Sequence, residues 1–322
     1  MENIKQTRLL EIFFRSLRGE NISVKELAAQ YNVSTKSVSR DINDLKLFFA
    51  DHRDLVGNTE LEYSYQDKCY HLYMDEFLTD KELFALAKII VGVRAFSKEE
   101  LLTVIGKLKN FTTVTDREKL SEILRKELYH YAEVKHDCES LEDTLWKLVG
   151  CITKGSEITV EYYRMDRACN QYRLRPASLL FADHYFYLIA FRMDKGTEHP
   201  YYFRVDRIRR ITEHRDKIFT EKLSFDEGLL RERSLYMWPG KLRTIRFEFD
   251  GPSVQAVLDK LPTAKIIDRR EGKYVIEAEV YGDGIKMWLL SQSSWLKVIA
   301  PKDFVAEMQE TVKKMAELYG LA

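Results

Sequence analysis

Two arginines and a tyrosine near the middle of the chain carry the side chains best suited to bind an anion. Tyr187 lies in the tripeptide Phe186-Tyr187-Leu188, and the run 203–208 that follows contains Arg204 and Arg207. Guanidinium forks bind phosphate oxygens through paired hydrogen bonds, and an aromatic ring offers a stacking face. The segment therefore predicts a pocket for a phosphate or a nucleotide.

The strand period leaves an alternative open for these arginines. Alternation places Arg204 on the same face as Tyr202 and Asp206, and turns Arg207 the other way unless a bulge or strand end intervenes. Arginines on half-exposed strands are usually solvated and salt-bridged, and Asp206 is an obvious partner. Period alone does not decide between a pocket and an ion-paired face.

Residues 23–46 predict a helix-turn-helix. Ser23 and Glu26 form a capping box for a short helix, residues 31–33 make a turn, and Ser34 caps a third helix to about Phe49. Polar side chains compatible with a DNA groove lie on the face opposite its apolar stripe. These candidate DNA-binding residues are Ser34, Thr35, Lys36, Ser37, Ser39, Arg40 and Asn43.

The segments that follow this third helix predict a wing and then a helical connector. Residues 61–73 alternate around a turn at 66–68, as in a two-stranded wing. Residues 77–136 carry helical stripes behind three capping boxes. The boxes are Thr79/Glu82, Ser97/Glu100 and Thr115/Glu118. The connector is either a dimer surface or a segment that packs on its neighbours.

The second half of the chain predicts two β-rich parts. A helix over 141–152 stops at Gly155, and strands then follow at 157–163, 171–181, 185–193 and 200–208, which indicates a small bent sheet or barrel. Residues 218–240 form an irregular bridge. The last 80 or so residues follow a βαββαβα order, which is typical of a ferredoxin-like sandwich. We expect a multidomain α+β fold.

Composition narrows the class of protein. The 51 basic and 51 acidic residues balance, so any contact with nucleic acid must come from a local patch. Four cysteines without a Cys-x-x-Cys pair, and no apolar leader or long apolar run, indicate a cytoplasmic protein without a membrane span.

We expect neither an enzyme nor a bound metal or other cofactor. His130, His136, Asp137 and Cys138 are the nearest approach to a metal cluster, but their spacing does not place the two histidines on one face. The sequence also lacks a glycine-rich phosphate loop and a Gly-x-Ser-x-Gly elbow.

Several of these motifs resemble those of WYL-domain transcriptional regulators. Residues 33–45 with Arg40-Asp41-Ile42, closing at Tyr70-His71-Leu72, are similar to the family's winged helix-turn-helix. Residues 141–215 resemble the WYL domain, an Sm-like β-barrel, with Phe186 in place of its tryptophan. The C-terminal part resembles the WCX extension, with residues 288–290 and 298–301 as its markers.

The resemblance implies an architecture and a function. It divides the chain at 1–74, 75–138, 139–220, 221–240 and 241–322 into DNA-binding head, connector, WYL domain, linker and WCX domain. It implies a homodimeric DNA-binding repressor of operator DNA that senses a nucleic acid fragment or nucleotide-like effector, as in regulators of phage defence or DNA damage. Tyr187, Arg204 and Arg207 would form the effector pocket, to which we add Tyr162, Arg175 and Ser178.

An accessory protein that binds single-stranded RNA or DNA away from promoters is the main alternative. Acidic residues at 41, 44, 51 and 54 lie close to Lys36 and Arg40 and keep this alternative open. The feature that separates the two is whether Lys36, Ser37 and Arg40 are exposed together.

Overall fold

The computed structural model describes residues 2–74, 78–112, 114–195, 200–219 and 226–321, without the side chains of residues 2–4, 114 and 115. By internal contacts the chain forms two compact units, Met1–Val134 and Lys135–Ala322. The finer five-part division stays a prediction. None of the described helices is long and apolar enough to cross a bilayer.

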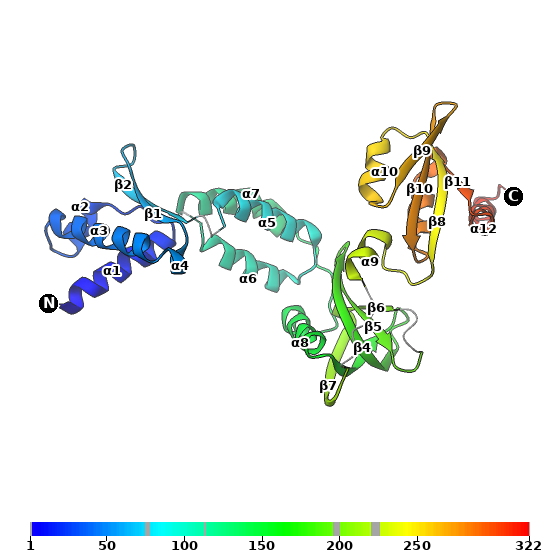
Figure 1. Cartoon of the computed structure of the whole chain (residues 1–322), viewed down its shortest axis with the longest axis horizontal. Helices are drawn as coiled ribbons and strands as arrows, with labels where there is room; N and C mark the ends of the chain where they lie inside the picture. Colours follow the sequence, from blue (N-terminus) through cyan, green and yellow to red (C-terminus); the bar gives the residue numbers. More distant parts are fainter. Residues whose placement is uncertain (1, 75–77, 113, 196–199, 220–225, 322) are drawn as a thin grey trace. The chain divides into compact units, whose positions relative to one another are not determined.

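The N-terminal unit begins with a winged helix-turn-helix head, which confirms the predicted elements (Figure 1). Its core contains Ile12, Leu27, Val38, Ile42 and Leu61, which come from three helices and the first wing strand. The short α4 was not predicted. The elements are α1 Glu2–Leu17, α2 Val24–Gln30, α3 Thr35–Asp51, α4 Arg53–Val56, and the antiparallel wing strands β1 Thr59–Ser64 and β2 Cys69–Met74.

Three helices follow the wing, as predicted: α5 Asp80–Val93, α6 Lys98–Lys109 and α7 Val114–Tyr129. The capping boxes Thr79/Glu82 and Ser97/Glu100 are both formed, with side chain and backbone satisfying each other in each pair. Thr115 of the third predicted box lies outside the described side chains. Ala87, Leu101, Ile105 and Leu124 form the core between the three helices.

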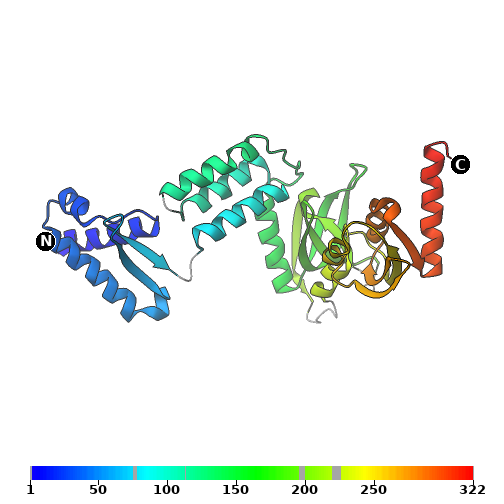
Figure 2. The same cartoon turned by 90° about the horizontal axis from the view of Figure 1, so that it is seen from above.

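The second unit begins with α8 Leu141–Lys154, which stops at Gly155 in the left-handed conformation (φ 69°). Five antiparallel strands follow in the hydrogen-bonded order β6-β5-β4-β3-β7, and Figure 2 shows α8 lying beside this sheet. They are β3 Ser156–Tyr163, β4 Cys169–Ala182, β5 Tyr185–Arg192, β6 Tyr201–Arg204 and β7 Ile208–Ile218.

Two expectations about this sheet are corrected. In the described residues the strand order runs from β6 to β7 without pairing between them, so the sheet is not closed and the Sm-like barrel is not confirmed. The predicted strand 200–208 is also two elements, because the 3₁₀ turn η1 Val205–Arg207 ends β6 and starts β7. This turn re-aims the side chains of residues 204–207 away from strict alternation.

The helix α9 Glu227–Arg233 was not predicted, and it leads into the C-terminal α+β part. The strand order there is β11-β8-β10-β9, all antiparallel, which matches the predicted split βαβ pattern. Its core includes Phe247, Ile276, Trp288 and Phe304. The elements are β8 Leu242–Phe249, α10 Val254–Lys260, β9 Lys265–Arg270, β10 Lys273–Tyr281, α11 Gly284–Ser291, η2 Ser293–Trp295, β11 Leu296–Ala300 and α12 Lys302–Leu318.

Candidate nucleic-acid and anion sites

The third helix of the head, α3, presents a polar face to solvent. It begins at Thr35 because the Ser34 hydroxyl accepts the backbone N–H of Ser37 at 3.2 Å. Val38, Ile42 and Phe49 are buried on one side of the helix. Lys36, Arg40 and Asn43 follow at i, i+4 and i+7, so they share the opposite side, and all three are exposed.

The predicted DNA-binding residues thus separate into two groups. Ser34 and Ser37 serve the helix start, with their hydroxyls 3.0 Å apart, and Ser37 and Ser39 are only half-exposed. Thr35, Lys36, Arg40 and Asn43 are exposed and available to a ligand. Lys36 and Arg40 therefore lie exposed together, whereas Ser37 serves mainly as part of the cap.

Two acidic residues of α3 are neutralised from α1. The buried Asp41 carboxylate pairs with the buried Arg8 guanidinium, which also lies 5.9 Å from the centroid of the Tyr31 ring. Asp44 pairs with Lys5 at 2.8 Å on the surface. Because each acid has its own cation, neither leaves an uncompensated negative charge next to Lys36 and Arg40.

The wing is a regular antiparallel hairpin whose tip carries exposed Tyr65 and Lys68. Lys68 has a left-handed backbone (φ 55°), consistent with its place in the tight turn. Close to the turn, the wing contacts α3, because the Lys46 ammonium lies 4.8 Å from the centroid of the Tyr70 ring. The tip is thus positioned by the same helix that carries the polar face.

In the sheet of the second unit, Arg204 is both paired and stacked. Tyr187 on β5 lies opposite Arg204 on β6. The Arg204 fork donates to both oxygens of Asp206 at 3.0 and 2.6 Å, and its Cζ lies 3.3 Å from the centroid of the Tyr185 ring. Asp206, the partner expected from the sequence, thus accepts hydrogen bonds from Nε and one terminal nitrogen of Arg204. A ligand would contact the other terminal nitrogen of this guanidinium.

Tyr162 of β3 lies close to both arginines of this segment, Arg204 and Arg207. The Tyr162 hydroxyl accepts the backbone N–H of Arg204 at 3.3 Å. Burial raises the pKa of Tyr162, although hydrogen bonds and the charges of Arg204 and Arg207 act in the opposite direction. Among the described residues Arg207 has no ion-pair partner, so it carries the net positive charge of this group.

Tyr187 keeps a neutral hydroxyl close to Arg204. Burial raises the pKa of Tyr187 to about 12, with the Arg204 charge opposing that shift. The ring packs against a buried cluster that includes Leu180 and Ile189 of the sheet and Leu230 and Met237 of the segment after it. Tyr187 can therefore donate a hydrogen bond at neutral pH, from a wall that the linker segment partly covers.

Two predicted site residues have other surroundings. The Arg175 guanidinium lies 4.4 Å from the centroid of the Phe219 ring, beyond the end of β7. Ser178 is buried next to a bulge in β4 between Pro176 and Ser178. The bulge breaks the alternation from which a shared face would be expected. The structure thus brings Tyr162, Tyr187, Arg204 and Arg207 to one end of the sheet.

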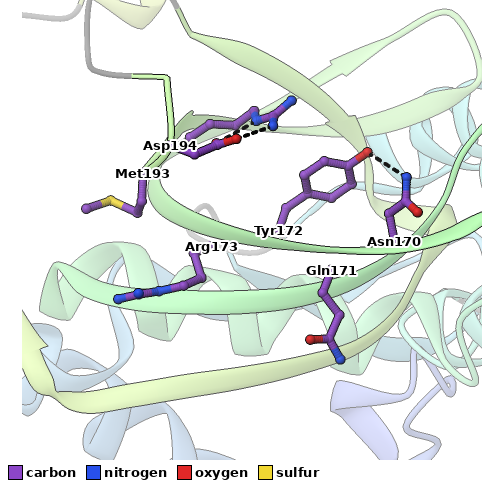
Figure 3. A pocket seen from close by; sticks show the side chains of 7 residues that line it. Asn170, Gln171, Tyr172, Arg173, Met193 and Asp194 are labelled. Carbon is purple, nitrogen blue, oxygen red and sulfur yellow. Dashed lines mark hydrogen bonds and ion pairs between the residues drawn. The ribbon is translucent and has the colours of Figure 1, made fainter.

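Sequence reasoning missed Tyr185 as a site residue and also missed a depression lined by polar side chains elsewhere on the sheet. This depression, with a volume of about 510 Å³, lies along the ends of β4 and β5 (Figure 3). In it Arg192 is held by Asp194 at 2.9 Å and lies 5.0 Å from the centroid of the Tyr172 ring. The signal that could have identified Tyr185 is its period-two spacing from Tyr187, which places both side chains on one face of the strand.

The three-helix head with its wing and the arginine-bearing antiparallel sheet define a multidomain α+β protein that carries a winged helix-turn-helix. Family models match an HTH domain over residues 5–51, a WYL domain over 143–213 and a WCX domain over 241–316. The chain therefore belongs to the WYL-domain regulators with an N-terminal HTH and a C-terminal WCX domain, as its motifs predicted.

Solved structures show more distant similarity. Proteasome accessory factor B/C (PafBC) of Arthrobacter aurescens is 15% identical with a TM-score of 0.32, and the match covers 94% of this chain and 46% of that one, so the chain spans about half its length. A CRISPR Cas-related protein is 15% identical with a TM-score of 0.38, covering 89% of this chain and 87% of the other. No curated protein matches the chain.

Proposed function

We propose that this protein is a cytoplasmic, non-catalytic transcriptional repressor that binds operator DNA as a homodimer and responds to a nucleic acid fragment or nucleotide-like anion in its WYL domain. The observation that carries the proposal is the face of α3. Lys36, Arg40 and Asn43 are exposed on one side of the helix, while Asp41 and Asp44 are each neutralised by α1. A helix of this kind can enter a major groove because the two acids beside Lys36 and Arg40 are already paired with cations.

The arrangement at the end of the sheet supports the effector part. Arg207 contributes a cation without a carboxylate among the described residues, and Tyr162 and Tyr187 contribute hydroxyls. One edge of the Arg204 guanidinium donates to Asp206, and its other edge is left for a ligand. A phosphate could accept hydrogen bonds from these groups, and a base could stack on an aromatic ring. The regulated genes, by the resemblance, would be a phage-defence or DNA-damage operon.

The DNA part is tested with Arg40→Ala. Fluorescence anisotropy on duplex DNA from the protein's own upstream region should show affinity weaker by about 1–3 kcal/mol, which is roughly 5- to 150-fold. Arg125→Ala is the matched control, because Arg125 is also an exposed helical arginine but lies in α7. Equal, small effects of both changes on duplex binding, with single-strand binding retained, would favour the accessory single-strand binder instead.

The effector part is tested at Arg207 rather than Arg204. Removing Arg204 would leave Asp206 buried without its cation, and misfolding would obscure the result. Arg207→Gln should abolish the response of DNA binding to short oligonucleotides or nucleotides while operator affinity is kept. Arg215→Gln, farther along β7 and exposed, should leave the response unchanged. Loss of the response in both variants would contradict the proposed pocket.

A further inference from the structure

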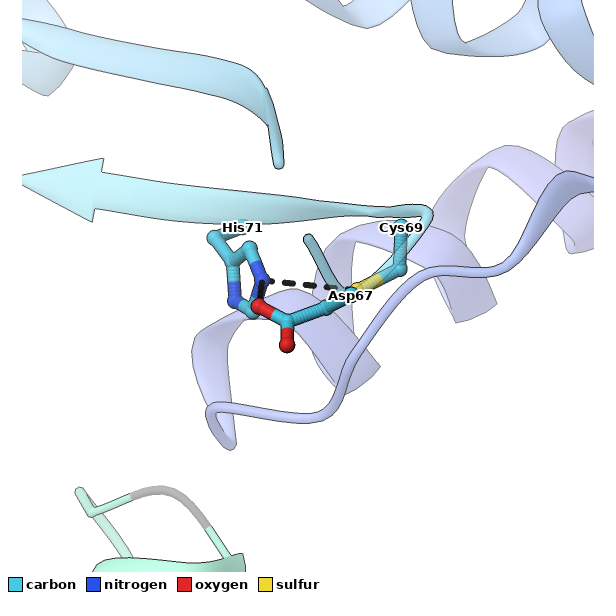
Figure 4. A group of neighbouring side chains, drawn as sticks. All are labelled: Asp67, Cys69 and His71. Atoms are coloured by element: carbon cyan, nitrogen blue, oxygen red, sulfur yellow. Dashed lines mark hydrogen bonds and ion pairs between the residues drawn. The ribbon is translucent and has the colours of Figure 1, made fainter. Parts of the chain in front are cut away.

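Three potential metal ligands converge at the turn of the wing. Asp67 lies in the turn and Cys69 and His71 alternate on β2, and one donor atom from each lies within 4.8 Å of the other two (Figure 4). Among the described residues this is the only such group of three or more. The sequence pattern Asp-x-Cys-x-His does not by itself indicate a site, because the turn must fold back before its carboxylate can meet the strand residues.

A chain of hydrogen bonds does not account for this arrangement. The Nε2 atom of His71 lies 3.3 Å from the Cys69 sulfur and 3.2 Å from Oδ2 of Asp67. One ring nitrogen has a single in-plane direction, occupied either by a proton or by a lone pair. The Nε2 atom can thus donate a hydrogen bond to Asp67 or accept one from Cys69, but it cannot do both at once. Three potential ligand atoms around one point are the arrangement expected around a metal cation.

The separations also fit a small tetrahedral ion. With Zn–S near 2.3 Å and Zn–N or Zn–O near 2.0–2.1 Å, tetrahedral geometry places neighbouring donor atoms about 3.3–3.6 Å apart. The two separations of 3.3 and 3.2 Å are close to these values. A thiolate, an imidazole and a carboxylate together favour zinc over magnesium or calcium, which prefer oxygen ligands alone. We propose that Asp67, Cys69 and His71 form a zinc site on the wing.

The neighbouring residues could complete such a site. Glu62 lies directly opposite His71 in the hairpin register, so its side chain is on the same face and is one candidate for a fourth ligand, although it is not part of the close group itself. The Ser64 hydroxyl donates to Oδ2 of Asp67 at 2.9 Å and orients that carboxylate. A water molecule is the other candidate for the fourth position.

A redox role for Cys69 fits less well. Its side chain is buried, and burial, followed by the charge of Asp67, raises the pKa of its thiol. A reactive cysteine is typically exposed and beside cations that stabilise the thiolate. Metal binding, in contrast, supplies a positive charge to the same sulfur atom.

The zinc would tie the turn to the strand. Asp67 and Lys68 belong to the same turn as the exposed Tyr65, so the ion would fix the tip of the wing. Binding of Zn²⁺ with deprotonation of the Cys69 thiol would make the charge of this site more positive by one unit, whether the fourth ligand is water or Glu62. If the proposed function holds, zinc should therefore strengthen contact between the wing and the DNA backbone.

Cobalt titration of the reduced full-length protein tests the site without any DNA. We expect one Co²⁺ per chain, a thiolate-to-cobalt charge-transfer band, the visible bands of tetrahedral cobalt, and displacement of both by one equivalent of Zn²⁺. His71→Gln and Asp67→Asn should each weaken cobalt binding by about 100-fold or more, because each removes a ligand. Cys69→Ser should remove the charge-transfer band.

Cys169→Ser is the matched control, since Cys169 is a free and exposed cysteine outside the trio. It should leave both the band and the affinity unchanged. A wild-type protein without a thiolate band at micromolar protein and excess cobalt would overturn the zinc site, as would a band that persists in Cys69→Ser. These outcomes concern the metal alone, so they are separate from a failure of Arg40→Ala to weaken DNA binding.

Discussion

Replacing Asp41 by asparagine should destabilise the DNA-binding head more than any neighbouring surface change. Asp41 is 1% exposed and its partner Arg8 6% exposed, so the substitution leaves a guanidinium charge buried without a counter-ion. Breaking a buried pair in this way costs about 3–5 kcal/mol. A domain has a total stability of only about 5–15 kcal/mol, so this single change would remove a large share of it.

Hydrogen exchange of the full-length protein, followed by mass spectrometry, measures this effect locally. A loss of 3 kcal/mol corresponds to roughly 150-fold faster exchange of the amides in α1 and α3, since about 1.4 kcal/mol is a factor of ten. Protection in the WYL and WCX parts should stay unchanged. The same variant should lose DNA binding in proportion to the unfolded fraction of the head.

Asp44→Asn is the matched control on the same helix. Asp44 also pairs with a cation of α1, but its side chain is 44% exposed and that of Lys5 is 53% exposed. Exposed pairs contribute about 1 kcal/mol or less, so exchange should change little. The double change Arg8→Met with Asp41→Leu should recover much of the lost stability, because it removes both charges. Equal exchange rates in Asp41→Asn and Asp44→Asn would refute the reasoning.

Two further predictions concern stability in the second unit. Burial raises the pKa of both Tyr187 and Tyr202 to about 12 from an ordinary value near 10, so the folded state holds these protons more tightly than the unfolded state. The free energy of unfolding should therefore fall as the pH rises from 10 to 12. In the double variant Tyr187→Phe with Tyr202→Phe, the midpoint of urea unfolding should depend less on pH over that range. Gly155→Ala should destabilise the fold by about 1 kcal/mol or more, because the φ of Gly155 is 69° and a Cβ there would lie 2.8 Å from the Phe219 carbonyl oxygen. Gly150→Ala, in the open middle of α8, should instead stabilise the fold by about 0.5–1 kcal/mol. Thermal melts that rank the two variants in the opposite order would contradict this assignment.

Local patterns in the sequence were sufficient for the head, the connector helices and the C-terminal part. Caps such as Ser34 and Thr79 and the 3.6-residue stripes act within a few residues, so they predict where α3 and α5 begin and which side each buries. The alternation of strands and helices in the last part likewise predicted its element order. The roles of Lys36 and Arg40 as exposed residues followed from the same periodicity.

Tertiary structure decided which side chains meet. The end of β6 at Arg204, the η1 turn and the bulge in β4 come from pairing between distant strands, and they separate Arg175 from the position that alternation implied. Neighbours decide whether each arginine's charge is balanced: Asp206 pairs with Arg204 through two hydrogen bonds, while Arg207, near Tyr162, has no ion-pair partner among the described residues.

Helix stripes, caps and strand alternation are short-range, so the sequence by itself predicted most of the elements, although not α4, α9 or the η1 turn, and the resemblance of its motifs indicated the order of domains. Only the folded chain decided that Asp41 is a buried partner of Arg8 and that Asp67, Cys69 and His71 converge on the wing. Burial, partner choice and ligand geometry depend on segments that are brought together by packing, and no local pattern encodes them.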